Sequence, residues 1–246
     1  VKNSRIKKTL VHSDRRFSYE EAQQIIETGE GEYCEEMLTL NNLAKLLREK
    51  RSQYGAINFE RMEVKFEIDE TGKPLRVFFK EMKDSNKMIE EFMLLANRTV
   101  AETIGKVPTG KKAKTFVYRI HDLPNPEKLG NFSEFVKRFG YKLKDRGNEK
   151  EIARSINHLL DEVQGSKEQN VIETIAIRSM AKATYSTHNI GHYGLAFKHY
   201  THFTSPIRRY PDMMVHRLLE RYLDGGRSVN ERQLEDECKH CSDMEA

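Results

Sequence analysis

Cysteine is scarce in this sequence. The 246 residues contain three cysteines, and Cys34 lies far from Cys238 and Cys241. Three are too few for a disulfide framework, and the single C-x-x-C pair has no second pair that could complete a tetrahedral zinc site. We therefore expect reduced cysteines on a helix of a cytosolic protein.

Long apolar runs are also missing. No stretch comes near the ~18 apolar residues that a membrane span requires, and charged residues make up 33% of the chain. The start of the chain lacks the pattern of a signal peptide. We expect a soluble, cytoplasmic protein with no membrane partner. Because residue 1 is Val rather than Met, we also expect a processed or excised piece of a longer product.

Several motifs of known chemistry are absent or incomplete. The sequence contains no G-x-S-x-G, no H-E-x-x-H and no D-x-D cluster. The spacing of Gly105, Gly110 and Lys111 is that of a phosphate-binding loop, but Lys112 stands where the motif needs Ser or Thr. The loop also follows a predicted helix, whereas the motif requires a preceding strand. We expect no small-molecule cofactor.

Hydrophobic spacing predicts a helix-rich fold. Ser18-x-x-Glu21 is a capping box that predicts a short helix ending before Gly29. Strict alternation over 62–69 predicts a strand with one face in solvent, paired through a turn at 71–74 with a strand at 75–79. Similar arguments predict helices over 37–54, 88–104, 126–139, 149–163, 167–183, 206–224 and from Ser228, with strands over 116–121 and 195–203. We expect an α+β fold with a small, mainly antiparallel sheet braced by several helices.

The segment HFTSPIRRYPD, residues 202–212, has features that favour anion binding. Ser205 as N-cap and Pro206 at the first helical position predict a helix start, whose free N–H groups attract negative charge. Arg208 and Arg209 would lie in its first turn and could bind phosphate through their guanidinium groups. Alternatively, these arginines pair with carboxylates on an ordinary helix surface. The residues alone leave both readings open.

Two residues that follow the arginines are predicted to fix their direction. Pro211 lacks the N–H of a helix interior, so we expect it to bend or restart the helix. Asp212 lies three and four residues after the arginines, where its carboxylate could hold one guanidinium.

Two other groups of charged residues allow alternative interpretations. The basic run Lys111, Lys112 and Lys114 fits a solvated loop, or a loop that contacts RNA. His121 and Asp122 could form a catalytic orienting pair, but an aspartate-built turn at a strand end is the more common arrangement.

The segment from Gly191 to Leu219 resembles the signature of the RNase II/RNase R family of exoribonucleases, in their RNB catalytic domain. Four further segments resemble RNB segments in the same order: 56–69, 88–102, 116–129 and 177–186. The resemblance spans essentially the whole chain, and its pattern is most similar to that of the RNase R branch.

The resemblance implies a processive hydrolytic 3′→5′ exoribonuclease that degrades single-stranded RNA to nucleoside 5′-monophosphates with two Mg²⁺ ions. In the family, the aspartate cluster that holds the metal lies upstream of the segment that matches Val1, and OB-fold domains flank the RNB core. Residues 1–246 are therefore expected to form a partial RNB domain. By itself this piece is expected to be inactive and to be able to associate with itself.

The resemblance also implies roles for individual residues. Arg208, followed by Arg209, is expected to act catalytically by neutralising charge on the scissile phosphate. Six further residues are expected to contact RNA: His202, Thr204, Ser205, Tyr210, Glu90 and Glu91. A glutamate near the terminal ribose would favour RNA over DNA, although the two glutamates could equally form an ordinary charged turn. The alternative for the whole chain is a non-catalytic RNA-binding or scaffold module of the same fold.

Overall fold

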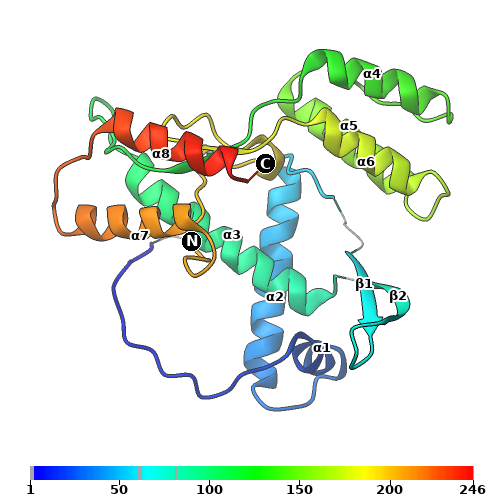
Figure 1. Cartoon of the computed structure of the whole chain (residues 1–246), viewed down its shortest axis with the longest axis horizontal. Helices are drawn as coiled ribbons and strands as arrows, with labels where there is room; N and C mark the ends of the chain where they lie inside the picture. The colour runs from blue at the N-terminus through cyan, green and yellow to red at the C-terminus, as the bar shows by residue number, and fades with distance from the viewer. Residues whose placement is uncertain (1–2, 60–62, 81, 246) are drawn as a thin grey trace. The chain divides into compact units, whose positions relative to one another are not determined.

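The structure, a computed structural model, describes residues 3–59, 63–80 and 82–245. Within these ranges the chain forms eight α-helices, one short 3₁₀-helix and two separate two-stranded sheets (Figure 1). The predicted helix-rich α+β class is confirmed, although the sheet residues form two antiparallel ribbons rather than one small sheet. No helix in the described ranges is both long and apolar enough to cross a membrane.

The elements follow one another irregularly along the chain, as predicted. The helices are α1 (Tyr19–Thr28), α2 (Cys34–Gln53), α3 (Asp84–Gly105), α4 (Pro126–Lys137), α5 (Glu149–Glu162), α6 (Gln169–Ser179), η1 (Tyr193–Leu195), α7 (Tyr210–Leu223) and α8 (Glu231–Asp243). The strands are β1 (Glu63–Ile68), β2 (Pro74–Lys80), β3 (Tyr118–Ile120) and β4 (Thr184–Ser186).

The chain divides into two compact units. The first comprises residues 1–49 and 59–92, and the second comprises residues 50–58 and 93–246. The boundaries after residues 49 and 92 fall inside α2 and α3, so each of these helices contributes to both units.

In the first unit, helix α1 has the ends that its sequence predicts. The Ser18 hydroxyl accepts a hydrogen bond from the Glu21 N–H at 3.1 Å, and the Glu21 carboxylate accepts one from the Ser18 N–H at 2.7 Å. Gly29 ends the helix in the left-handed region, at a φ of 70°, where glycine carries no steric penalty.

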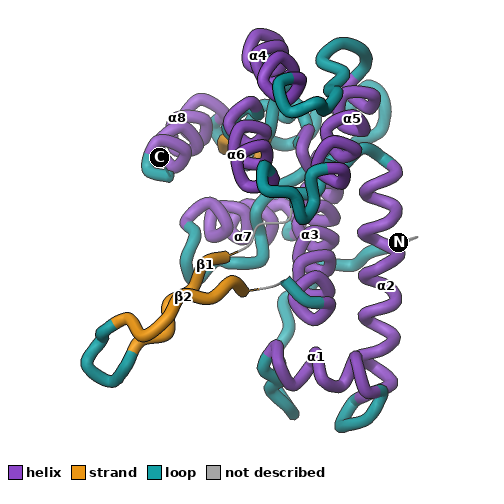
Figure 2. The backbone as a smooth tube through the Cα atoms, turned by 90° about the vertical axis from the view of Figure 1, so that its right-hand side faces the viewer, coloured by secondary structure: helices purple, strands orange, loops and turns teal. Residues whose placement is uncertain are grey.

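The hairpin of β1 and β2 forms the predicted antiparallel pair, seen in Figure 2 as two orange strands joined by a teal loop. The alternation predicted one solvated face and one buried face. In the structure the apolar face is exposed as well, through Phe66, Ile68, Leu75 and Val77. Among the described residues, this apolar face has no layer packed on it.

In the second unit, helices α4, α5 and α6 pack together around one apolar cluster. Asn125 begins α4 as predicted, because its side chain accepts hydrogen bonds from the N–H groups of Glu127 and Lys128. The cluster is formed by the buried side chains of Leu129, Phe132, Val136, Ile156, Leu159 and Ile172.

The second ribbon, β3 with β4, is covered by α8. The Tyr185 N–H donates to the Ser242 hydroxyl at 2.8 Å, and the Glu235 carboxylate accepts from the Thr187 N–H at 2.6 Å. The predicted start of α8 at Ser228 is wrong: Asn230 caps the helix. The Ser228 hydroxyl instead donates to Thr115 at 3.0 Å.

The predicted strand over residues 195–203 is also wrong. The chain closes a tight turn in which the His192 N–H donates to the Phe197 carbonyl at 2.8 Å, and Ala196 adopts a φ of 54°. The following residues run beside β3 with isolated contacts, such as the Arg119 N–H donating to the Tyr200 carbonyl at 2.9 Å. Sequence alternation could not distinguish this anchored loop from a strand, because tertiary hydrogen bonds determine it.

Candidate nucleic-acid interface

The segment from Ser205 to Arg209 forms a turn, not the predicted helix start. The Ser205 carbonyl accepts hydrogen bonds from the N–H groups of Arg208 and Arg209 at 3.3 and 3.1 Å. Helix α7 begins at Tyr210 with Arg209 as its N-cap residue. Pro211 therefore lies in the first turn, where a missing N–H costs nothing, and it does not interrupt the helix.

Arg209 is held by Asp212, as the sequence suggested. Its Nε donates to Asp212 Oδ2 and its Nη2 donates to Asp212 Oδ1, both at 2.8 Å. Asp212 is fully buried and the Arg209 side chain is 19% exposed. Burial alone would lower the pKa of Arg209, but the hydrogen bonds and charge of Asp212 raise it. Asp212 Oδ1 also accepts from the Ser205 N–H at 2.7 Å, so one carboxylate fixes both ends of the turn.

Arg208 differs from its neighbour. It is exposed, next to the fully exposed Ile207, and its side chain makes no hydrogen bond or ion pair with the part of the chain that the structure describes. The turn therefore presents one fixed guanidinium and one that is free to bind an anion. The reading in which both arginines pair with surface carboxylates is wrong for Arg208, and Arg209 pairs with a buried carboxylate.

Asn97 of α3 anchors the chain just before this turn. Its Oδ1 accepts hydrogen bonds from the N–H groups of Phe203 and Thr204 at 2.9 and 3.2 Å, and its Nδ2 donates to the Tyr200 hydroxyl at 3.2 Å. Asn97 is only 3% exposed. Thr201 adds a second buried anchor, since its hydroxyl donates to the Val117 carbonyl at 2.7 Å.

The ring of His202 belongs to a chain of polar contacts. Its Nδ1 lies 2.8 Å from the Tyr185 hydroxyl, which donates to Glu245 Oε1 at 2.9 Å. Arg119 donates to Glu245 Oε2 at 2.6 Å and also lies over the Tyr185 ring, 4.4 Å from its centroid. Burial and the positive charges of Arg209 and Arg119 lower the pKa of His202 to about 4, so the imidazole is neutral at pH 7.

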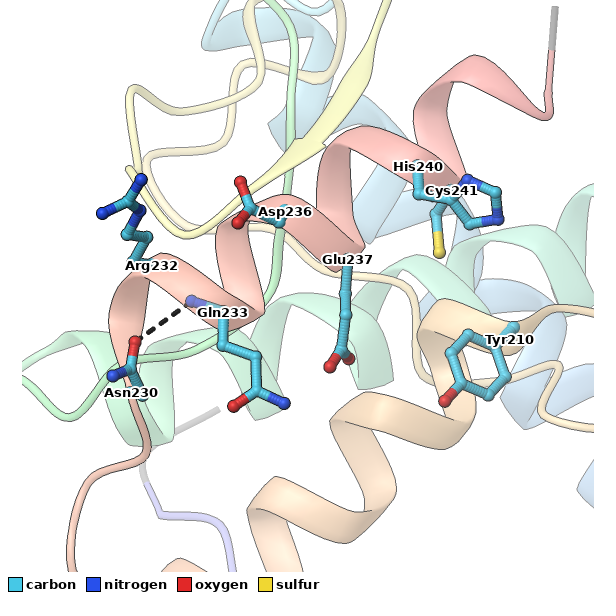
Figure 3. A pocket seen from close by; sticks show the side chains of 8 residues that line it. All are labelled: Tyr210, Asn230, Arg232, Gln233, Asp236, Glu237, His240 and Cys241. Atoms are coloured by element: carbon cyan, nitrogen blue, oxygen red, sulfur yellow. Dashed lines mark hydrogen bonds between the residues drawn. The ribbon is translucent and has the colours of Figure 1, made fainter.

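The other residues predicted to contact RNA lie in different settings. Thr204 and Ser205 are partly buried within the anchored segment. Tyr210 is 55% exposed and lines a groove of about 530 Å³ between the first turn of α7 and α8. Figure 3 shows the rest of the lining: Asn230, Arg232, Gln233, Asp236, Glu237, His240 and Cys241.

The two glutamates predicted to contact RNA belong to the first unit, whereas the residues above belong to the second. Both belong to α3. Glu90 is exposed, whereas Glu91 is 4% exposed. Glu90 is therefore the one available to a ligand.

For His121 and for the basic run that contains Lys114, the structure favours the structural interpretation over the functional one. Both ring nitrogens of His121 are used internally: Nε2 donates to the Ala181 carbonyl at 2.7 Å, and Nδ1 accepts from the Gly194 N–H at 2.9 Å. Lys114 donates to the Gly226 carbonyl at 2.8 Å, so part of the basic run holds the α7–α8 loop.

Cys238 and Cys241 lie on α8, a helix as predicted, Cys34 begins α2, and all three thiols are free. Burial raises the pKa of Cys238 to about 12, so this thiol is protonated and unreactive at neutral pH.

Sequence reasoning missed four residues of this site: Asn97, Arg119, Tyr185 and Glu245. The only local signal was for Asn97, a polar residue inside a largely apolar helical stretch. Arg119 belongs to β3 and Tyr185 to β4, and Glu245 follows the end of α8. Only the folded chain brings them to His202.

Comparison with known proteins identifies the relatives of this chain. The family model described as "RNB domain" matches residues 1–225. The chain belongs to the RNB family. This confirms the family to which Gly191–Leu219 pointed.

The RNB chain is 36% identical over 226 residues to the Ribonuclease R of Aquifex aeolicus, which covers 89% of this chain and 31% of that protein. The solved structure of Mycoplasma genitalium RNase R in complex with ribose methylated single-stranded RNA matches with a TM-score of 0.76 at 28% identity, over 93% of this chain and 36% of that one. Yeast Ssd1, described as a pseudonuclease, shares the fold with a TM-score of 0.65 at 21% identity, over 92% of this chain and 27% of that one. The RNB chain spans about a third of the length of the first two relatives.

Proposed function

We propose that this RNB chain supplies the phosphate-binding part of a hydrolytic 3′→5′ exoribonuclease that acts on single-stranded RNA. The proposal rests on the turn from Ser205 to Arg209, called the arginine turn below. Arg209 is fixed by a buried carboxylate, and the adjacent Arg208 projects with no partner among the described residues. A fixed guanidinium beside a free one suits a phosphodiester, which offers two non-bridging oxygens to donors.

The assignment of roles follows from the difference between the two arginines. Arg209 has already given two N–H groups to Asp212, so its main effect is a fixed positive charge. Arg208 can move onto a phosphate and neutralise the charge that develops on it, which is the catalytic role we propose. Thr204, Ser205 and Tyr210 are proposed to line the path of the strand, and Glu90 of the first unit is proposed as a separate contact to RNA.

The residues described here do not fit a magnesium pair. Among them, no group of three or more His, Cys, Asp or Glu side chains is placed to hold a metal ion. We therefore derive no step through Mg²⁺, and propose that the metal-binding aspartates are supplied from outside these 246 residues, which form a partial RNB domain. The chain alone is proposed to bind RNA without hydrolysing it.

The decisive test is a Mg²⁺-dependent assay on 5′-labelled single-stranded RNA with the full-length protein and its Arg208→Ala variant. We expect stepwise shortening from the 3′ end that slows by roughly 10²–10³ in the variant, as for the loss of one transition-state donor. Arg154→Ala is the matched control, because Arg154 is also exposed with no partner in the described ranges. Equal losses in both variants would refute the role of Arg208.

A non-catalytic RNA-binding module is the second candidate function. The lack of a metal-binding group among the described residues favours it, and the same fold occurs in a protein described as a pseudonuclease. The assay separates the two candidates: a full-length protein that binds RNA but never shortens it is a binding module.

The exposed apolar face of the β1–β2 hairpin supports the expected self-association of the chain. We expect the apparent mass in size-exclusion chromatography to rise with protein concentration. Phe66→Ser should reduce this rise, and a mass that is independent of concentration would contradict the expectation.

A further inference from the structure

The protonation state of the His202 ring is determined by Tyr185, Glu245 and Arg119, which are linked to the ring by successive contacts. Glu245 accepts from Arg119 at 2.6 Å and from Tyr185 at 2.9 Å. Burial alone would raise the pKa of Glu245, but the hydrogen bond and charge of Arg119 lower it. The ionised carboxylate can only accept hydrogen bonds, so the Tyr185 hydroxyl gives it its single hydrogen.

The same reasoning fixes which ring nitrogen of His202 carries the hydrogen. Once the Tyr185 hydroxyl has donated to Glu245, its oxygen can only accept from His202 Nδ1 at 2.8 Å. A neutral imidazole has one N–H, so Nε2 carries a lone pair. The hydrogen bonds that run from Arg119 through Glu245 and Tyr185 to His202 thus select the tautomer with its hydrogen on Nδ1.

Nε2 is not used in any hydrogen bond that the structure describes. Among the described residues, the buried unpartnered side-chain atoms belong to five other residues. The charged groups that face the ring are Arg209, Arg119, Asp212 and Glu245. The positive charges of Arg209 and Arg119 disfavour protonation of the imidazole, so the ring stays neutral.

A neutral ring with this tautomer cannot serve as a phosphate contact through Nε2. Phosphate oxygens are acceptors, and so is the Nε2 lone pair. His202 therefore requires a hydrogen-bond donor as its ligand. Apart from the hydroxyls at the two ends of a strand, the only such donor on a nucleic acid backbone is the ribose 2′-hydroxyl, which DNA lacks. Any phosphate bound by the arginine turn is flanked by riboses.

We propose that His202 Nε2 accepts a hydrogen bond from a ribose 2′-hydroxyl of the bound strand and so selects RNA over DNA, with Tyr185, Glu245 and Arg119 as positioning residues. This inference rests on the proposed binding of single-stranded RNA. It makes the expected RNA contact of His202 a contact to the sugar.

The test compares binding of three labelled strands of one sequence, in RNA, DNA and 2′-O-methyl RNA, by fluorescence anisotropy with the 246-residue chain in EDTA. We expect RNA to bind about two- to tenfold more tightly than the other two strands, the range for one hydrogen bond. His202→Asn keeps a donor for the Tyr185 oxygen but removes Nε2, so the three affinities should converge. Arg208→Ala is the control, because it should weaken all three strands alike.

The tautomer is measured directly by ¹⁵N NMR of histidine-labelled protein at pH 7. We expect His202 to have a protonated Nδ1 and an unprotonated Nε2, and Tyr185→Phe to shift the ring toward the other tautomer. This measurement decides the tautomer in the wild-type protein even if His202→Asn does not fold, which circular dichroism would show.

The outcomes separate the inference from the proposed function. Equal weakening of RNA and DNA by His202→Asn, or a protonated Nε2 in the wild-type protein, would overturn the sugar contact and leave RNA binding intact. Failure of the wild-type protein to bind any of the three strands would overturn the proposed function and this inference with it.

Discussion

Replacing Asn97 with alanine removes a buried amide that holds the chain ahead of the arginine turn. Two backbone N–H groups, of Phe203 and Thr204, lose their acceptor. Each buried donor left unpaired costs about 1–3 kcal/mol, so we expect the free energy of unfolding to fall by about 2–6 kcal/mol. Water that enters the vacated space would keep the loss near the lower figure.

The assay is urea unfolding at pH 7, followed by far-ultraviolet circular dichroism. Thr103→Ala is the matched control on the same helix, since Thr103 is exposed and its hydroxyl bonds only to the Thr99 carbonyl. We expect the control to change stability by no more than about 0.5 kcal/mol. If Asn97→Ala also loses less than about 1 kcal/mol, the reasoning that this amide holds the segment is refuted.

Three further predictions follow from the same region. Arg209→Lys cannot reproduce the two-point pairing with buried Asp212, so we expect a loss of about 1–3 kcal/mol in urea unfolding; an unchanged midpoint would contradict this. His202 stays neutral in the folded protein down to about pH 4, whereas an unfolded histidine takes up a proton near pH 6.5. The unfolded state therefore binds more protons in this window, and stability should fall by roughly 2 kcal/mol from pH 7 to 5; His202→Asn should show a weaker dependence. Gly105→Ala would place a Cβ 2.5 Å from His199 Cδ2, so we expect about 1–3 kcal/mol of destabilisation, visible as a lower melting temperature.

Local sequence signals predicted the elements whose ends depend on local contacts. Ser18 and Glu21 cap α1 as a capping box, and Asn125 caps α4. In each case the partner is at most three residues away, so the pattern contains the interaction. Ser228 fails as a cap because its hydroxyl is taken by Thr115, 113 residues earlier in the chain, where a local pattern cannot register the competition.

The residue pattern predicted the arginines of the candidate site, and the family resemblance added His202. The clustering of the arginines beside Asp212 in one short segment allowed a phosphate-binding prediction and the contact between Arg209 and Asp212. The helix start was misplaced because Ser205 uses its backbone N–H to reach Asp212, and that closes a turn instead of a helix. Asn97 contacts Tyr200 across 103 residues, and such partners follow from packing rather than from sequence spacing.

The passage of α2 and α3 through both compact units has a consequence for dissecting the protein. Each unit is built from two separated stretches of chain, and two of the three boundaries, those after residues 49 and 92, fall within a continuous run of helical hydrogen bonds. A cut after residue 49 or 92 would leave helix stubs that must nucleate anew, which short peptides in water do poorly. Neither unit can therefore be expressed as a simple excised fragment. Protease digestion of the folded chain should nick the connecting loops before it severs these two helices.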